Sequence, residues 1–376
     1  MTKSRKLFED IDERSDSTQA SSIKTLSVEQ SSLLKIWLWT LLISLISLIL
    51  VGGWTRLTDS GLSIVEWKPI TGMIPPFSSE GWIVEFEKYK SIPEFKLVNF
   101  AITMDEFKFI YWWEWGHRQL ARFIGVVWFV GFLVLWLKNK IPERWTFYLF
   151  GIGLLGALQA FLGWWMVSSG LDGQVVDVFS YRLAIHLTMA FIILTLIFWA
   201  ILFHSENSVK IFESRRYRKK FSVNVLAGLG VLCYVQLALG ALVAGIDAGR
   251  GYNDWPLMNG NWVPDDLFDY VPFISNFFEN PGLVQFNHRI TAYLLFVAVC
   301  LVWWSNRKSP YSKIRVASNY LIIIIVAQML LGIFTVLYSA PLSLASIHQF
   351  TAILFILAYV NLFFKTYYPV NQEINS

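Results

Sequence analysis

Residues 111–137 read Tyr111-Trp-Trp-Glu-Trp-Gly-His-Arg-Gln-Leu-Ala-Arg-Phe-Ile-Gly-Val-Val-Trp-Phe-Val-Gly-Phe-Leu-Val-Leu-Trp-Leu137. As a helix rising about 1.5 Å per residue, this run is long enough to cross roughly 30 Å of hydrocarbon. It carries His117 near its start. Three further apolar runs open with a histidine in the same way: His186, His288 and His348. An imidazole in hydrocarbon is costly unless it faces a partner inside a bundle, so these four histidines are candidate functional residues.

The rest of the chain has the composition of a membrane protein, with 55% hydrophobic and only 15% charged residues. Its apolar runs are too long and too uniform for the alternating strands of a barrel. We therefore predict an all-α integral membrane protein with eight transmembrane helices. The predicted spans are Ile36–Gly53, Tyr111–Leu137, Trp145–Ser168, Tyr181–Phe203, Phe221–Ile246, Leu283–Trp304, Tyr320–Leu337 and Ala345–Phe364. The fifth histidine, His204, lies among polar residues after a span, and we interpret it as a loop residue.

The basic residues indicate the orientation, since Lys and Arg are enriched in cytoplasmic loops. The short loops 169–181 and 338–345 have none, and the opposite loops and the N-terminus carry Lys3, Arg5, Lys6, Lys138, Lys140, Arg144, Arg215, Arg216, Arg218, Lys219, Lys220, Arg307, Lys308, Lys313 and Arg315. Both termini are therefore predicted on the cytoplasmic (or matrix) side, with the four histidines near the outer face. The first 32 residues resemble neither a secretory signal nor a transit peptide, which favours a bacterial inner membrane. The net charge of +4 then requires no nucleic-acid partner.

The chain is interpreted as a duplication. The His117-Arg118 pair matches His288-Arg289, and His186 matches His348. Because each half has an even number of spans, we predict two pseudo-symmetric four-helix bundles related as parallel repeats. The predicted parts are a polar segment 1–35, a bundle 36–204 with outer loop 54–110, a linker 205–220, a bundle 221–366 with outer loop 247–282, and a tail 367–376.

A Gln-x-x-x-Gly pattern recurs on three of the spans. Its members are Gln159/Gly163, Gln236/Gly240 and Gln328/Gly332. Small residues allow helices to approach closely, and a glutamine can bond across helices. We interpret these residues as structural.

Two histidines at one depth on different helices can bind opposite faces of a porphyrin iron. Zinc would need three or four ligands, and neither half offers a third. Buried histidines that bond to carbonyls or line a proton path are the plainer alternative. Since the pairing recurs in both halves, we favour two haems side by side near the outer surface, held by His117 with His186 and by His288 with His348.

The halves differ beside the first histidine of each pair, where Glu114 in one half corresponds to Gln285 in the other. Positions i and i+3 share a helix face, so each side chain is expected to face the pocket of its histidine. A carboxylate can hold a proton or stabilise positive charge, which favours chemistry in the N-terminal half. A guanidinium suits a haem propionate. Five arginines near the outer ends are candidates for that contact: Arg118, Arg289, Arg122, Arg56 and Arg182.

Several separated motifs resemble the haem A synthase family. They are Gly52-Gly-Trp-Thr-Arg-Leu-Thr-Asp-Ser-Gly-Leu-Ser63, Glu114-x-x-His-Arg118, Trp255-Pro-Leu-Met-x-Gly260 and the four helix-opening histidines. The resemblance extends from about Gly52 to His348. It implies oxidation of the methyl group of haem O to the formyl group of haem A, the cofactor of cytochrome oxidases. It also implies haem O synthase and oxidase assembly factors as partners, and lipid surroundings.

The resemblance further implies a role for each site residue. Haem b would be held by His288 and His348, and the substrate haem O by His117 and His186, with Glu114 catalytic. The two cysteines fall inside predicted spans, so the chain resembles the branch of the family without cysteine pairs in its outer loops.

If both histidines stay bound to the substrate iron, O₂ has no open position there. Oxidation would then proceed by electron withdrawal in successive hydroxylations, with water supplying the oxygen and an unidentified redox partner taking the electrons. Two other functions remain open: a di-haem b-type electron-transfer protein and a haem carrier or transporter. Small residues facing lipid would permit a homo-oligomer.

Overall fold

The computed structural model describes residues 31–171 and 175–370, and it is all-helical in these ranges apart from loops and turns. Eight of its helices are long and apolar enough to cross a membrane. They are α2 (Ser32–Leu57), α5 (Met104–Leu137), α6 (Glu143–Leu171), α7 (Ser180–Ser205), α9 (Lys220–Gly245), α11 (Pro281–Asn306), α12 (Ser312–Leu337) and α13 (Leu342–Tyr367). Each predicted span falls on one of them, so the prediction of an all-α membrane protein with eight spanning helices is confirmed.

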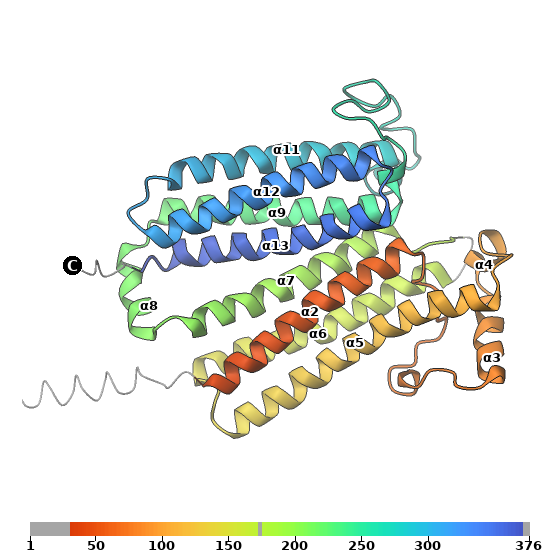
Figure 1. The fold of residues 1–376 in the computed structure, drawn as a ribbon, viewed down its shortest axis with the longest axis horizontal. Coiled ribbons are helices and arrows are strands. Elements are labelled where there is room, and N and C mark those ends of the chain that lie inside the picture. The colour runs from red at the N-terminus through yellow and green to blue at the C-terminus, as the bar shows by residue number, and fades with distance from the viewer. Residues whose placement is uncertain (1–30, 172–174, 371–376) are drawn as a thin grey trace, which may run out of the picture.

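The eight helices lie in two groups. Figure 1 shows α2, α5, α6 and α7 together below α9, α11, α12 and α13, with α7, α2 and α13 in contact where the groups meet. The short α8 (Ser208–Ser214) connects the groups. The predicted polar segment 1–35 and tail 367–376 lie mostly outside the described residues. Helix α2 already begins at Ser32, within the predicted polar segment, and α13 ends at Tyr367, the first residue of the predicted tail. The repeat relation between the halves stays a prediction at this level.

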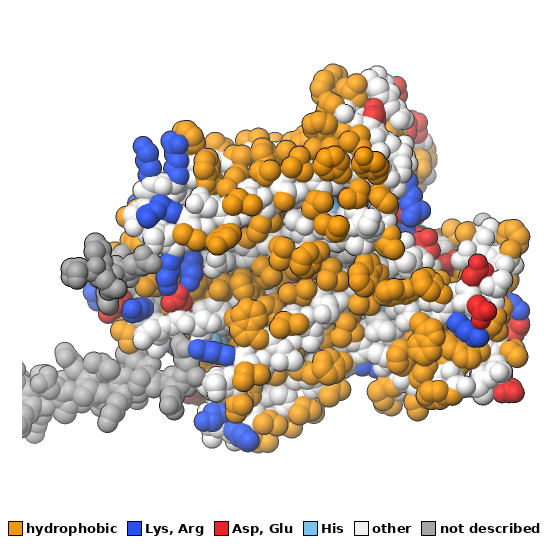
Figure 2. All heavy atoms as spheres, viewed as in Figure 1, with side chains coloured by type: hydrophobic (Ala, Val, Ile, Leu, Met, Phe, Trp, Pro, Cys, Tyr) orange, Lys and Arg blue, Asp and Glu red, His pale blue; other side chains and the backbone are white. Residues whose placement is uncertain are grey.

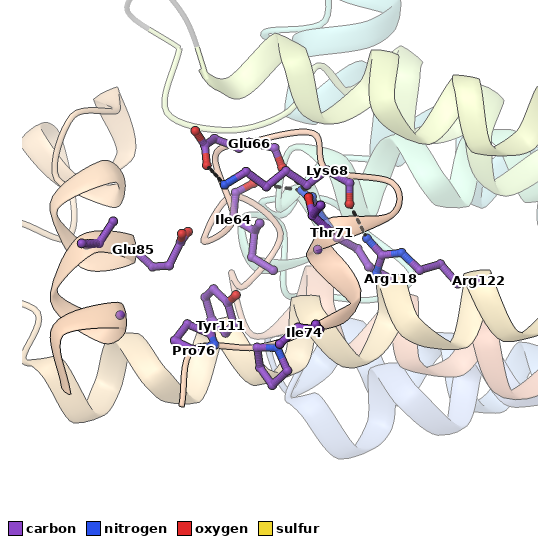
Figure 3. Close-up of a pocket in the computed structure, with 14 residues that line it drawn as sticks. Ile64, Glu66, Lys68, Thr71, Ile74, Pro76, Glu85, Tyr111, Arg118 and Arg122 are labelled. Atoms are coloured by element: carbon purple, nitrogen blue, oxygen red, sulfur yellow. Dashed lines mark hydrogen bonds and ion pairs between the residues drawn. The ribbon is translucent and has the colours of Figure 1, made fainter. Parts of the chain in front are cut away.

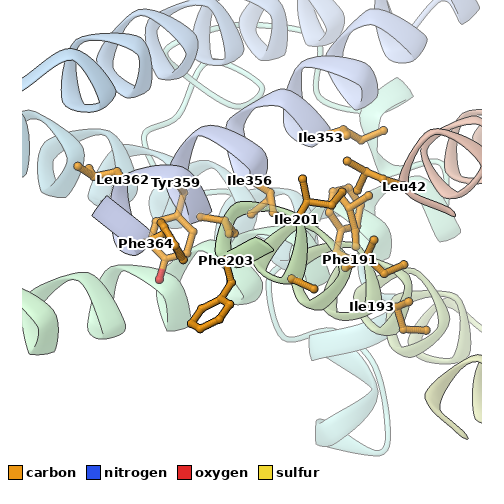
Figure 4. Packing of buried hydrophobic residues seen from close by; sticks show 14 of the residues in the cluster. Leu42, Phe191, Ile193, Ile201, Phe203, Ile353, Ile356, Tyr359, Leu362 and Phe364 are labelled. Carbon is orange, nitrogen blue, oxygen red and sulfur yellow. The ribbon is translucent and has the colours of Figure 1, made fainter. Parts of the chain in front are cut away.

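A single buried cluster joins the two groups. Leu42 of α2, Phe191 of α7 and Ile353 of α13 are among its members, as Figure 4 shows. At the end of the bundle near α8, the Glu206 carboxylate accepts hydrogen bonds from Lys313 Nζ at 3.0 Å and Lys365 Nζ at 2.6 Å. Because these contacts connect residues from both groups, the halves form one continuous packed unit.

Two sequence interpretations are corrected here. His204 is not a loop residue: α7 continues to Ser205, and the imidazole is buried against the ring of Trp145, with ring centroids 4.7 Å apart. Helix α5 begins at Met104, not at Tyr111. Thr103 and Glu106 form a capping box, in which each side chain bonds the backbone N–H of the other, and this starts the helix two turns earlier.

The segment between α2 and α5 forms a cap over the N-terminal group. It contains α3 (Ser79–Tyr89) and α4 (Pro93–Leu97), and its apolar residues pack on the extension of α5 and the start of α7. The corresponding C-terminal segment between α9 and α11 contains α10 (Asn276–Glu279) and three short 3₁₀ or bridge elements. Both segments lie at the same end of the bundle in Figure 1, opposite α8.

Glu94 is the buried carboxyl of the cap, and only 6% of its surface is exposed. Its Oε1 accepts a hydrogen bond of 3.3 Å from Asn99 Nδ2, and its Oε2 has no partner. Burial, together with the negative charges of Asp177, Glu114 and Asp59, raises the pKa of Glu94 to about 8, and the positive charge of Arg56 opposes the rise. The cap therefore contains a carboxyl group that is costly to ionise.

We predict that Glu94→Gln stabilises the protein at alkaline pH. The folded-state pKa of about 8 lies above the ordinary value of 4.5, so ionisation costs folding free energy increasingly as pH rises between these values. Each unit of pKa shift corresponds to about 1.4 kcal/mol, so the gain at pH 9 is on the order of a few kcal/mol and is small at pH 5. Thermal unfolding in detergent at the two pH values measures it. The exposed Glu80→Gln in the same cap is the control, and an equal effect of Glu94→Gln at both pH values contradicts the prediction.

Candidate functional site

The four paired histidines lie at the same end of the bundle. Three of them, His186, His288 and His348, lie within about two turns of the start of α7, α11 and α13. His117 lies further along α5, because that helix extends beyond the bundle into the cap. Gly52, which contacts His117, lies on α2, and α2 packs against α7, which carries His186. In the same way Gly240, which contacts His288, lies on α9, and α9 packs against α13, which carries His348. The structure thus brings together the pairs that the sequence predicts.

Each histidine ring packs against a glycine of the preceding long helix. A Cβ added at the glycine would lie between 2.9 and 3.1 Å from the nearest ring atom in all four cases. The contacts are Gly52 with His117, Gly163 with His186, Gly240 with His288 and Gly332 with His348. Cβ atoms in proteins seldom approach other atoms this closely, so a side chain at any of these glycines would require the histidine ring or the helix to shift. The glycines therefore fix the position of the imidazoles, a more specific role than the general helix packing that we inferred from the sequence.

The three glutamines of the Gln-x-x-x-Gly pattern also contact histidines. Gln159 Nε2 lies 3.2 Å from His186 Nδ1, Gln236 Nε2 lies 3.0 Å from His288 Nδ1, and Gln328 Nε2 lies 3.3 Å from His348 Nε2. The expected bonds across helices are present, and their partners are the candidate ligands. These glutamines were not predicted as site residues, although their fixed spacing from the glycines was the available signal in the sequence.

Glu114 is 3% exposed and is surrounded by donors. Its Oε2 accepts 2.8 Å hydrogen bonds from Ser63 Oγ and from the Ile64 backbone N–H. Its Oε1 accepts from Arg118 Nε at 3.1 Å and Nη2 at 2.6 Å. Arg118 also donates to the carbonyl oxygens of Ile64 and Glu66. The pair Glu114–Arg118 therefore fastens the segment that follows α2 onto α5.

Gln285 and Arg289 do the same in the C-terminal half. Gln285 Oε1 accepts from Arg289 Nη2 at 2.9 Å, and Gln285 Nε2 donates to the Ala248 carbonyl at 2.8 Å. Arg289 donates to the Tyr252 and Leu257 carbonyls, both at 2.9 Å. Gln285 has to donate to the Ala248 carbonyl, which a carboxylate cannot do. Glu114 only accepts hydrogen bonds, so a carboxylate suits its position. The Glu/Gln difference between the halves thus has a local structural reason, whether or not it also has a chemical one.

The other candidate arginines are also bonded to the protein. Arg122 donates to the Pro69 and Lys68 carbonyls, both at 2.9 Å, and its Nη1 has no partner. Arg182 donates to the Trp165 carbonyl at 2.6 Å and stacks over the Trp165 ring. That any of the five arginines also meets a haem propionate stays a prediction.

Arg56 joins three acidic residues at the histidine end of α2. Its guanidinium lies 2.8 Å from Asp59, 2.9 Å from Asp177 and 3.3 Å from Asp247. Asp177 precedes α7 and Asp247 follows α9, so one arginine connects the two halves close to both histidine pairs. Burial raises the pKa of Asp177, and the positive charge of Arg56 opposes that rise.

A cavity of about 320 Å³ lies on the cap side of Arg118, as Figure 3 shows. Its walls come from the segment 64–76, from α3 and from α5, and they include Glu66, Glu85, Tyr111 and Arg122. None of the four paired histidines lines it. We therefore do not assign this cavity to a haem.

The residues present fit bis-histidine haem binding. Glycines leave room for the four imidazoles, and several buried polar atoms beside the rings have no partner within the described ranges. They are the ring nitrogen His348 Nδ1 and the amide oxygens Gln159 Oε1, Gln236 Oε1 and Gln328 Oε1. An imidazole bound to iron through one nitrogen presents an N–H at the other, and an amide oxygen would accept from such a group.

Comparison with known proteins identifies the family. Residues 35–360 match a family described as cytochrome oxidase assembly protein. The haem A synthase of Dinoroseobacter shibae is 46% identical over 380 residues, covering 100% of this chain and 99% of that protein. Those of Roseobacter denitrificans (44%, covering 100% and 99%) and Paracoccus denitrificans (47%, covering 85% and 84%) are also similar. The two cysteines of this chain lie in α9 and α11, so its outer segments have none. The chain therefore belongs to the haem A synthase family of cytochrome oxidase assembly proteins.

Proposed function

We propose that this protein is an oxidoreductase that converts haem O to haem A by successive hydroxylation of one methyl group. The observation that carries the proposal is the fourfold histidine–glycine contact at one end of the bundle. It provides two bis-histidine sites in a chain whose relatives are haem A synthases. A soluble redox enzyme would not need paired imidazoles inside membrane-spanning helices, where each one is costly.

The two sites would take different haems. Haem b would be the resident cofactor of the C-terminal half, between His288 and His348, and it would supply electron-transfer chemistry there. Haem O would be the substrate of the N-terminal half, between His117 and His186. Glu114 lies one turn from His117 on the same helix, so its carboxylate, paired with Arg118, would lie beside the substrate.

The contacts of Glu114 favour an electrostatic role. Four hydrogen bonds hold the carboxylate, and accepting a proton would require it to lose at least one of these partners. A fixed, preorganised charge stabilises positive charge that develops on the reacting methyl carbon. Water would then add to that carbon and supply the oxygen atom, while protons leave to solvent and electrons leave to an unidentified redox partner.

The orientation is part of the proposal. On the face shown in Figure 2, Lys and Arg gather mainly at the α8 end, whereas most Asp and Glu lie at the histidine end. By the positive-inside rule, the α8 end faces the cytoplasm of a bacterial cell and the histidines lie near the outer face of its inner membrane. Haem O synthase and oxidase assembly factors would be partners there. Helix glycines whose added Cβ would meet nothing within 4 Å, such as Gly151, Gly156 and Gly228, would permit a homo-oligomer.

A di-haem electron-transfer protein is the second candidate. The equivalent loop contacts of Glu114–Arg118 and Gln285–Arg289 favour it, because they account for the Glu/Gln difference without any chemistry. A haem carrier is less favoured, because all four paired histidines lie at one end of the bundle and mark no path across it.

We expect Glu114→Gln and His117→Ala to abolish haem A formation in a host that makes haem O but no haem A. Loss of one preorganised electrostatic contact typically costs about 10²- to 10³-fold in rate. Extracted haems are identified by chromatography. Asp105→Asn, on the same helix but with a highly exposed side chain, is the control and should keep activity. Full activity of Glu114→Gln would favour the electron-transfer protein instead.

We expect Gly240→Val to empty the C-terminal haem site. A Cβ there would already lie 3.0 Å from the His288 ring, and two further methyl groups force the imidazole away. Gly228→Val on the same helix meets nothing within 4 Å and should leave haem b bound. Haem b per purified chain is the measurement, and equal haem content in both variants contradicts the role given to Gly240.

The water route predicts the source of the formyl oxygen. Labelled water should place its oxygen in the formyl group, measured by mass spectrometry of haem A before exchange with solvent. Label arriving from ¹⁸O₂ instead would show that oxygen is activated at the iron, and therefore that a histidine leaves the substrate.

A further inference from the structure

We propose that side-chain amides beside the histidines decide which haem is retained and which is exchanged. Gln236 and Gln328 act as positioning residues that hold the ligand imidazoles of the C-terminal half, and Leu48 leaves His117 without such a partner. This inference rests on the proposed function and deepens it.

The residue four positions before each histidine-contacting glycine differs among the four sets. Residues i and i+4 share a helix face, so this position lies beside the same ring, one turn deeper in the bundle. The four sets are Leu48–Gly52–His117, Gln159–Gly163–His186, Gln236–Gly240–His288 and Gln328–Gly332–His348. Three of the four sets carry an amide, and the set on α2 carries an aliphatic side chain in its place.

The amides of the C-terminal half serve only the imidazoles. Gln236 Nε2 lies 3.0 and 3.3 Å from the two ring nitrogens of His288, and Gln328 Nε2 lies 3.3 Å from His348 Nε2. Both Oε1 atoms are buried without a partner. A glutamine amide carries an NH₂ donor and an oxygen acceptor, and a 180° rotation of the amide group exchanges their positions. Each glutamine can therefore present an oxygen to the N–H of an imidazole whose other nitrogen binds iron.

In the N-terminal half only one of the two paired histidines has such an amide. Gln159 Nε2 lies 3.2 and 3.3 Å from the two ring nitrogens of His186, as Gln236 does with His288, but it also donates to the His186 backbone carbonyl at 3.0 Å, which favours the donor orientation of this amide. Leu48 has no polar side-chain atom. Within the described ranges, His117 is the one paired histidine whose ring nitrogens make no hydrogen bond with a glutamine.

This difference has a direct consequence for iron binding. An acceptor on the outer N–H of a ligand imidazole fixes the ring and raises its basicity, and removing it typically weakens metal binding by about 10- to 100-fold. A resident cofactor needs strong ligands, whereas a substrate must leave after it becomes product. The amide pattern gives the C-terminal half the strong ligands and gives the N-terminal half at least one weak ligand, His117.

The test exchanges the equivalent residues of α9 and α2. Gln236→Met removes the amide and keeps the length of the side chain, and Leu48→Gln adds an amide. The full-length protein is purified with its haems, which are identified by extraction. Transfer of each haem to excess apomyoglobin is timed, and the midpoint potential of haem b is titrated.

We expect Gln236→Met to release haem b about tenfold faster or more, with a higher midpoint potential, because a less basic imidazole stabilises ferric iron less. Leu48→Gln should slow release of the N-terminal haem by a similar factor. Gln236→Glu, which keeps an acceptor, should retain haem b and lower its potential. If Gln236 acted through packing alone, the midpoint potential of haem b would stay unchanged in both Gln236→Met and Gln236→Glu.

Unchanged release rates and potentials in Gln236→Met and Leu48→Gln would overturn the inference. If Gln236→Met does not fold, Gln328→Met and Leu48→Gln decide the same question from other helices. The wild-type protein separates this failure from that of the proposed function. Absence of a bis-histidine haem spectrum in the wild type refutes the haem sites themselves, whereas a normal wild-type spectrum with unchanged variants refutes only the amide assignment.

Discussion

The contact between an imidazole and a glycine on the neighbouring helix is the constraint on which the rest of the site depends. It occurs four times, always with an added Cβ falling about 3 Å from the ring. A side chain at any of the four glycines would crowd the imidazole at its present position. Each candidate ligand is therefore positioned by two helices, its own and the one that carries the glycine.

The outer segments are fastened to these same helices. Glu114 and Arg118 on α5, and Gln285 and Arg289 on α11, bond to backbone groups of the segments that cover the histidine end. In each half, the helix that carries the histidine is therefore fastened to the loop segment above it by the residues three positions before and one position after that histidine. A change at Glu114 would disturb both the electrostatics of the site and the position of its cover, so activity should be measured together with haem content in such variants.

Much of the fold followed from the sequence, and the misses have identifiable causes. Length and uniform apolarity were sufficient to find all eight spans. The start of α5 was misplaced because its first two turns lie in a mixed polar and aromatic stretch, where a capping box and not hydrophobicity sets the boundary. His204 was misread because its polar neighbours concealed the aromatic packing supplied by Trp145 from another helix. The contacts of three candidate arginines with backbone carbonyls could not be predicted, because these carbonyls belong to loops whose paths only the fold reveals.

The sequence by itself determined the class of protein, the eight spans, the place of the four histidines on those spans and the family. These depend on composition, length and motif order, which are properties of the chain alone. The tertiary structure decided which glycine meets which imidazole, which partners the glutamines have, and that Leu48 occupies the position of an amide. A helix that is apolar on all sides carries no periodic signal of the face it turns inward. Only packing against its neighbours fixes that rotation, and with it the surroundings of every ligand.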